Sequence, residues 1–146
     1  MSIIDTYPNS IYEWDLVVAN KDATLVELRK LFKCSNGNEL PDTLTSSAST
    51  ISAIRKSDNK YCCLVKFNCY GDYCKTSKDK ILWLANTAAH EAAHYCLDIY
   101  NSISDDVCTT HQEPFCYLLG WATECIYNTW TKKTNGSTQK RNKAKG

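Results

Sequence analysis

The stretch SKDKILWLANTAAHEAAHYCLDIY, residues 77–100, carries the longest helical signal in the chain. It contains no glycine or proline, and its alanines and leucines favour a single long α-helix that ends near Tyr100. Thr76 with Asp79 three positions later resembles a capping box, so the helix is expected to begin at Thr76 or Ser77. The motif HEAAH, residues 90–94, lies inside this predicted helix.

Segments on either side of this helix combine strand and helix patterns, which indicates an α+β fold. Asp22 is placed to cap the first of the other helices. Residues 57–59 form a turn between two β-like runs and predict a hairpin within 47–68. The predicted elements are a strand over 11–20, a helix over 22–32, hairpin strands over 49–56 and 60–67, and a second helix that opens at Pro114.

Length and charge favour one domain, residues 1–131, followed by a basic tail. The 146 residues suit a single core, and no stretch approaches the roughly 18 consecutive apolar residues of a membrane span. The N-terminus lacks the basic and apolar regions of a signal peptide, so a cytoplasmic protein is expected. Residues 132–146 contain six basic and no acidic residues and are expected to be disordered. Because the remainder is acidic, only this tail suits a nucleic acid.

The nine cysteines indicate free thiols, because their number is odd and no signal peptide precedes them. Four of them lie close together in CCLVKFNCYGDYC, residues 62–74. Their spacing lacks the paired CxxC motifs of a zinc ribbon, and Cys62 and Cys63 are expected to face opposite sides of a strand. Buried free thiols are therefore expected here.

His90 and His94 stand four positions apart, so on a helix they project from one face and offer two imidazole nitrogens to one metal ion. Glu91 is turned by about 100° and is expected beside the metal, where a general base takes a proton from a metal-bound water. Two of the three histidines of the chain are used here. The alternative is a pair of histidines that form hydrogen bonds on a shared helix face without a metal.

HEAAH on a long helix resembles the HExxH helix of the zincin metallopeptidases. The element order is similar to the minimal zincin core and to small HExxH proteins of phages and bacteria. The resemblance covers residues 11–130 in element order, but only residues 90–94 by strict motif. It implies a minimal zincin-like fold, with a small sheet and its hairpin packed on the HExxH helix. It also implies Zn2+ as cofactor, His90 and His94 as ligands, and Glu91 as the catalytic base.

Catalytic zinc usually has three protein ligands, and the second predicted helix is expected to supply the third. By the resemblance this ligand is Glu113, which lies 19 residues after His94 at the start of that helix. His111 is the alternative third ligand. Glu124 and Cys108 also remain open.

Two further side chains lie one helical turn from these positions. Asp98 follows His94 and is a candidate to hold an imidazole in its tautomer. Tyr117 follows Glu113, and its hydroxyl is a candidate to stabilise an oxyanion. The structural alternatives are a solvated Asp98 and a Tyr117 that packs in the core.

The predicted function is zinc-dependent hydrolysis of peptide bonds by a water that Glu91 activates. By the resemblance to zincins, a peptide or protein substrate is expected to lie extended along one strand of the hairpin. The alternative is a catalytically inactive zincin-fold protein that serves as a structural or protein-binding component, for example of a phage particle. It would bind an assembly partner in place of a substrate, in a host cytoplasm or in a virion.

Overall fold

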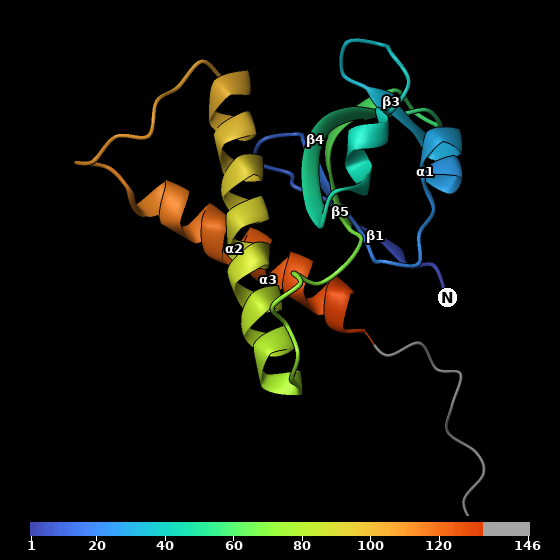
Figure 1. Ribbon diagram of the computed structural model, residues 1–146. Helices are drawn as coiled ribbons and strands as arrows, with labels where there is room; N and C mark the ends of the chain where they lie inside the picture. Colours follow the sequence, from blue (N-terminus) through green and yellow to red (C-terminus); the bar gives the residue numbers. More distant parts are fainter. Residues whose placement is uncertain (133–146) are drawn as a thin grey trace, which may run out of the picture.

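The computed structural model describes residues 1–132, which form a five-stranded sheet and three α-helices. The predicted α+β class is confirmed. Helices α2 and α3 cover one face of the sheet, and α1 packs against the other (Figure 1). The elements are β1 (Ile4–Tyr7), β2 (Asp15–Ala19), α1 (Leu25–Leu31), β3 (Phe32–Cys34), the 3-10 helix η1 (Asp42–Thr45), β4 (Ala48–Arg55), β5 (Lys60–Phe67), α2 (Ser77–Ser102) and α3 (Glu113–Thr131).

The strands are ordered β1-β2-β5-β4-β3, with β2 and β5 parallel and all other neighbours antiparallel. The predicted hairpin is confirmed as β4 and β5, which pair from Ala48 opposite Phe67 to Arg55 opposite Lys60. The predicted first strand begins later than expected, at Asp15, because the chain turns before it and Glu13 has a φ of 58°. Strands β1 and β3 were not predicted.

The long helix begins as predicted, with Thr76 as its cap and Asp79 completing the capping box. It continues two residues beyond the predicted end, to Ser102. The predicted cap of the first helix was wrong. Thr24 caps α1 and forms a capping box with Glu27, whereas Asp22 binds the N-terminal amine. No helix within the described residues is long and apolar enough to cross a membrane.

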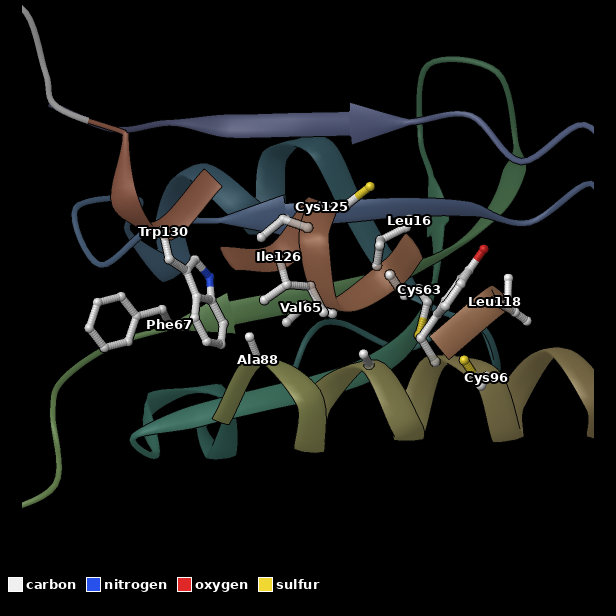
Figure 2. Close-up of a cluster of buried hydrophobic side chains, with 14 of the residues drawn as sticks. Leu16, Cys63, Val65, Phe67, Ala88, Cys96, Leu118, Cys125, Ile126 and Trp130 are labelled. Carbon is white, nitrogen blue, oxygen red and sulfur yellow. The ribbon is translucent and has the colours of Figure 1, made fainter. Parts of the chain in front are cut away.

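The sheet buries a hydrophobic cluster on each face. On the face covered by α2 and α3, Val65 and Phe67 of β5 meet Ile126 and Trp130 of α3 (Figure 2). Cys63 lies in this cluster, whereas Cys62 lies in the cluster beneath α1, so the prediction that they face opposite sides is confirmed. All nine cysteines are free, and five of them are buried.

Lys132, the first residue of the expected tail, lies within the described residues. Lys132 Nζ lies 2.6 Å from Asp5 Oδ2, which joins the end of α3 to β1. Residues 133–146, which contain the other basic residues of that segment, lie outside the described residues.

Lys66 of β5 is 3% exposed, and its Nζ donates to the carbonyls of Asn20 and Phe67. Burial lowers the pKa of Lys66 from 10.5 to about 8. Between these two pH values the unfolded chain binds this proton more tightly, so Lys66 makes the folded state more stable as pH rises through the window.

Relative to the wild type, Lys66→Met is therefore expected to be more stable at neutral pH than at high pH. The unfolding free energy of the variant minus that of the wild type should fall by up to about 3 kcal/mol between pH 7 and pH 10.5. Urea unfolding at both pH values measures this. The subtraction removes the contribution of the buried thiols, which affects stability in the same range because burial raises the pKa of Cys62 and Cys96 from 9.0 to about 12. A difference independent of pH would contradict the prediction.

Candidate metal centre on helix α2

His90 and His94 lie in the middle of α2, and both side chains are exposed. Their Nε2 atoms are 3.2 Å apart, and their ring centroids are 4.9 Å apart. The prediction that the two rings project from one face of the helix is confirmed. The opposite side of α2, with Ala92 and Tyr95, is buried and holds the helix in place.

The spacing of the two nitrogens suits a shared metal ion. Two imidazole nitrogens on tetrahedral zinc, each about 2.0–2.1 Å from the metal, are roughly 3.3 Å apart. The observed separation of 3.2 Å between the Nε2 atoms of His90 and His94 is close to this value. The same separation suits a hydrogen bond between the rings when one nitrogen carries a proton. A measurement of metal content distinguishes the two arrangements.

Glu91 follows His90 in sequence but is only 5% exposed. Its Oε2 accepts a hydrogen bond of 2.6 Å from Thr50 Oγ1 of β4. Residues 1–132 supply no hydrogen-bond partner to Oε1, and they leave no buried polar side-chain atom unsatisfied. Oε1 therefore retains accessible surface, and Glu91 is one of the residues that line the cavity beside the histidines, whereas Oε2 is anchored to the strand.

A second hydroxyl–carboxylate bond joins the same strand to the same helix two turns further on. Ser52 Oγ donates to Asp98 Oδ2 at 2.8 Å, and Cys63 Sγ lies 3.5 Å from the same oxygen. Burial, followed by the charge of Asp98, raises the pKa of the Cys63 thiol. The structure thus places Asp98 against β4 and β5, where its hydrogen bonds link helix to sheet. An imidazole is not among the partners found for it within residues 1–132.

A cavity of about 360 Å³ opens between α2 and the first half of β4. Strand β3 pairs with β4 only over residues 53–55, so residues 48–51 have no strand beside their outer edge in the described part of the chain. This open edge runs past the histidine pair. The cavity is lined by Pro41, Thr43, Leu44, Ser46, Ala48, Ser49, Thr50, Ile51, His90, Glu91 and His94.

Glu113, the expected third ligand, is not brought to the histidine pair. Among residues 1–132, no three His, Cys, Asp or Glu side chains are grouped so as to hold a metal ion. Helix α3 begins beside the C-terminal part of α2, where Phe115 packs on Tyr100 with 5.6 Å between ring centroids. Tyr100 lies six residues after His94, or about 9 Å along the helix axis. Glu113 would reach the pair only if the first turn of α3 moved.

The alternative ligand His111 lies in the exposed loop before α3. Its Nδ1 is 3.1 Å from Thr110 Oγ1 and 3.9 Å from Cys108 Sγ. Hydrogen bonds from Thr110 and then His111 lower the pKa of the Cys108 thiol to about 7. Tyr117 is 75% exposed, so the structural alternative in which it packs in the core was wrong. It lines a separate cavity against residues 8–12.

Thr50 and Ser52 were missed by the sequence analysis. Their hydroxyls alternate with apolar Ile51, a period of two that places them on one face of β4. That period was a usable signal for a polar face, but which helix lies opposite depends on tertiary packing.

Comparison with protein-family models, curated proteins and solved structures gives no match for this chain. The resemblance to zincins therefore depends on HEAAH and on the order of the elements. A proposal for the function must therefore be argued from the geometry of His90, His94 and Glu91.

Proposed function

We propose that this protein is a zinc-dependent metallopeptidase in which His90 and His94 bind the metal and Glu91 is the catalytic base. The observation that carries the proposal is the pair of Nε2 atoms 3.2 Å apart, next to a carboxylate anchored through one oxygen. A minimal zincin-like arrangement is part of the proposal. The packing of α2 against both β4 and α3 supports it.

Bound zinc supplies a Lewis acid that polarises a peptide carbonyl and makes a water molecule more acidic. Glu91 accepts a proton from the attacking water through Oε1, the oxygen that retains accessible surface. It then delivers this proton to the amide nitrogen as the carbon–nitrogen bond breaks, so that an acid and an amine are released. Thr50 keeps the other oxygen, Oε2, on the strand.

The substrate in this proposal is an extended peptide segment beside the open edge of β4. Residues 48–51 lack a neighbouring strand on that side within the described chain, and they line the same cavity as the histidines. Main-chain hydrogen bonds to a strand edge bind an extended peptide with little dependence on its side chains. A peptide bond held there lies next to His90, His94 and Glu91.

The zinc content of the purified, untagged protein tests the proposal by elemental mass spectrometry. After remetallation we expect about one zinc per chain in the wild type and below about 0.1 in His94→Ala, because a single imidazole binds zinc weakly. His111→Ala is the matched control, since it removes the one histidine outside the pair. An absence of zinc from the wild type would contradict the proposal, whereas an equal loss in His111→Ala would show that His111, the alternative third ligand, also binds the metal.

Glu113 is retained as the proposed third ligand, reached by a movement of the first turn of α3. Its exposed side chain is free of the core, so such a movement breaks no packing by Glu113 itself. A rise in the zinc Kd of about tenfold or more in Glu113→Gln would assign it to the metal. An unchanged Kd would indicate that water, and not Glu113, occupies the third coordination position.

The alternative function, a structural or protein-binding component, is favoured by a separate observation. Helix α2 exposes Ile81, Leu82 and Leu97, and between Lys80 and Asp98 its only charged residue is the buried Glu91. Exposed apolar side chains on one element suit a protein contact. Zinc binding without hydrolysis of any peptide in a mixed library would favour this function.

A further inference from the structure

We infer that Thr50 is a positioning residue, which holds the carboxylate of Glu91 in the orientation that hydrolysis requires. The inference deepens the proposed function and rests on it. Thr50 Oγ1 donates to Glu91 Oε2 at 2.6 Å, across the space between β4 and α2. The HEAAH motif does not include Thr50, which precedes Glu91 by 41 residues.

The short contact fixes which carboxylate oxygen is available. A buried carboxylate must accept hydrogen bonds, and a charge-assisted O–H···O bond is among the strongest that it can accept. Glu91 is 5% exposed and receives this bond at Oε2, so Oε1 is the oxygen left accessible. Rotation of the carboxylate would break the Thr50 bond, and the hydroxyl therefore resists it.

Other hydroxyls of the cavity do not take this role. The Ser46 and Ser49 side chains are bonded to each other, with 2.5 Å between their Oγ atoms. Ser46 Oγ also donates to the carbonyl of Ala48. Thr50 is therefore the strand side chain that holds Glu91.

Thr50 also belongs to the open edge of β4. Its backbone lies within the segment that has no neighbouring strand in the described chain, whereas its side chain holds the base. A peptide that pairs with this segment restrains Thr50, and through its hydroxyl restrains Glu91. Substrate binding and placement of the base are thus linked through one residue.

Thr50→Val removes the hydroxyl at nearly constant volume, and Thr50→Ser retains it. Ser52→Ala is the matched control, because it removes the equivalent hydroxyl bond to Asp98 from the same face of the same strand. We expect Thr50→Val to lower kcat about 10- to 100-fold while KM and the zinc Kd stay within about threefold, since orientation of the base is lost. Thr50→Ser should restore kcat to within about threefold of wild type, and Ser52→Ala should keep it within about twofold.

An equal loss of kcat in Thr50→Val and Ser52→Ala would overturn the inference, because a general loosening of β4 from α2 would then explain both. A failure of Thr50→Ser to restore kcat would overturn it as well.

A second measurement needs no catalysis. In the metal-free protein with 13C-labelled glutamate, the carboxyl resonance of Glu91 should move in Thr50→Val and stay in place in Thr50→Ser and Ser52→Ala. If the wild type hydrolyses no peptide, the proposed function fails, and this resonance still decides whether Thr50 holds Glu91. An unmoved resonance in Thr50→Val would overturn the inference.

Discussion

Glu91→Gln is expected to lower the rate of peptide hydrolysis about 10²- to 10⁴-fold while leaving zinc bound. Glutamine has nearly the same shape, and its side-chain oxygen can still accept the Thr50 hydroxyl, so the strand–helix contact is preserved. The amide cannot accept a proton from water at neutral pH, which removes the base. In the proposal zinc is bound by the Nε2 atoms of His90 and His94 and not by Glu91, so about one zinc per chain should remain. Hydrolysis of a peptide library followed by mass spectrometry, with zinc content measured on the same samples, tests this.

The control is Glu39→Gln, which makes the same change at an exposed glutamate that is not among the candidate ligands. Its activity and zinc content should equal those of the wild type. A Glu91→Gln protein that retains full activity would show that the base is another group. Loss of zinc in the same variant would show that Glu91 is itself a ligand.

Tyr95→Ala is expected to lower the free energy of unfolding by about 3–5 kcal/mol. Tyr95 is fully buried on the side of α2 that faces α3, with its ring centroid 6.1 Å from that of Trp121. Its hydroxyl donates to the carbonyl of Trp14 at 3.0 Å and accepts from Asn9 Nδ2 at 2.9 Å. The truncation therefore leaves a cavity between helix and sheet and two unsatisfied polar groups. Urea unfolding followed by far-UV circular dichroism measures the change.

Two variants separate these contributions. Tyr95→Phe keeps the ring and loses only the hydroxyl, so we expect a cost of about 1–3 kcal/mol. Leu97→Ala truncates a side chain that is 51% exposed on the same helix, and should change stability by less than about 1 kcal/mol. If Tyr95→Ala cost no more than Leu97→Ala, Tyr95 would not be a central packing residue.

Local signals made much of the fold predictable. The hairpin β4–β5 and the start of α2 depend on alternation, turn residues and a capping box within a few positions. Strand β3 was missed because Phe32 directly continues the helical spacing of α1, and only its pairing with Arg55 shows that it is extended. Strand β1 is four residues long and is defined by its ladder with β2. Both short strands are therefore defined by their pairing with another strand and not by a pattern within their own residues.

The same distinction applies to the candidate site. The shared face of His90 and His94 follows from their spacing of four on one helix, and the structure confirms it. The hydroxyl partners of Glu91 and Asp98 come from β4, more than 40 positions earlier, and no spacing within α2 predicts them. The place of Glu113 depends on how α3 crosses α2, which the loop between the helices does not specify.

Among residues 1–132, β5 is the last strand in sequence, but it lies in the middle of the sheet, between β2 and β4. During synthesis β1 and β2 emerge first, and a two-stranded pair is at best marginally stable on its own. The edge of β2 that pairs with β5 stays open until residues 60–67 leave the ribosome, and Val18 on the face beneath α2 and α3 stays uncovered until these helices follow. The sheet therefore closes late and from its centre, through a parallel pairing that is distant in sequence and correspondingly slow. We expect chains that stall before Lys60 to leave this edge of β2 unpaired and to aggregate more readily than longer chains.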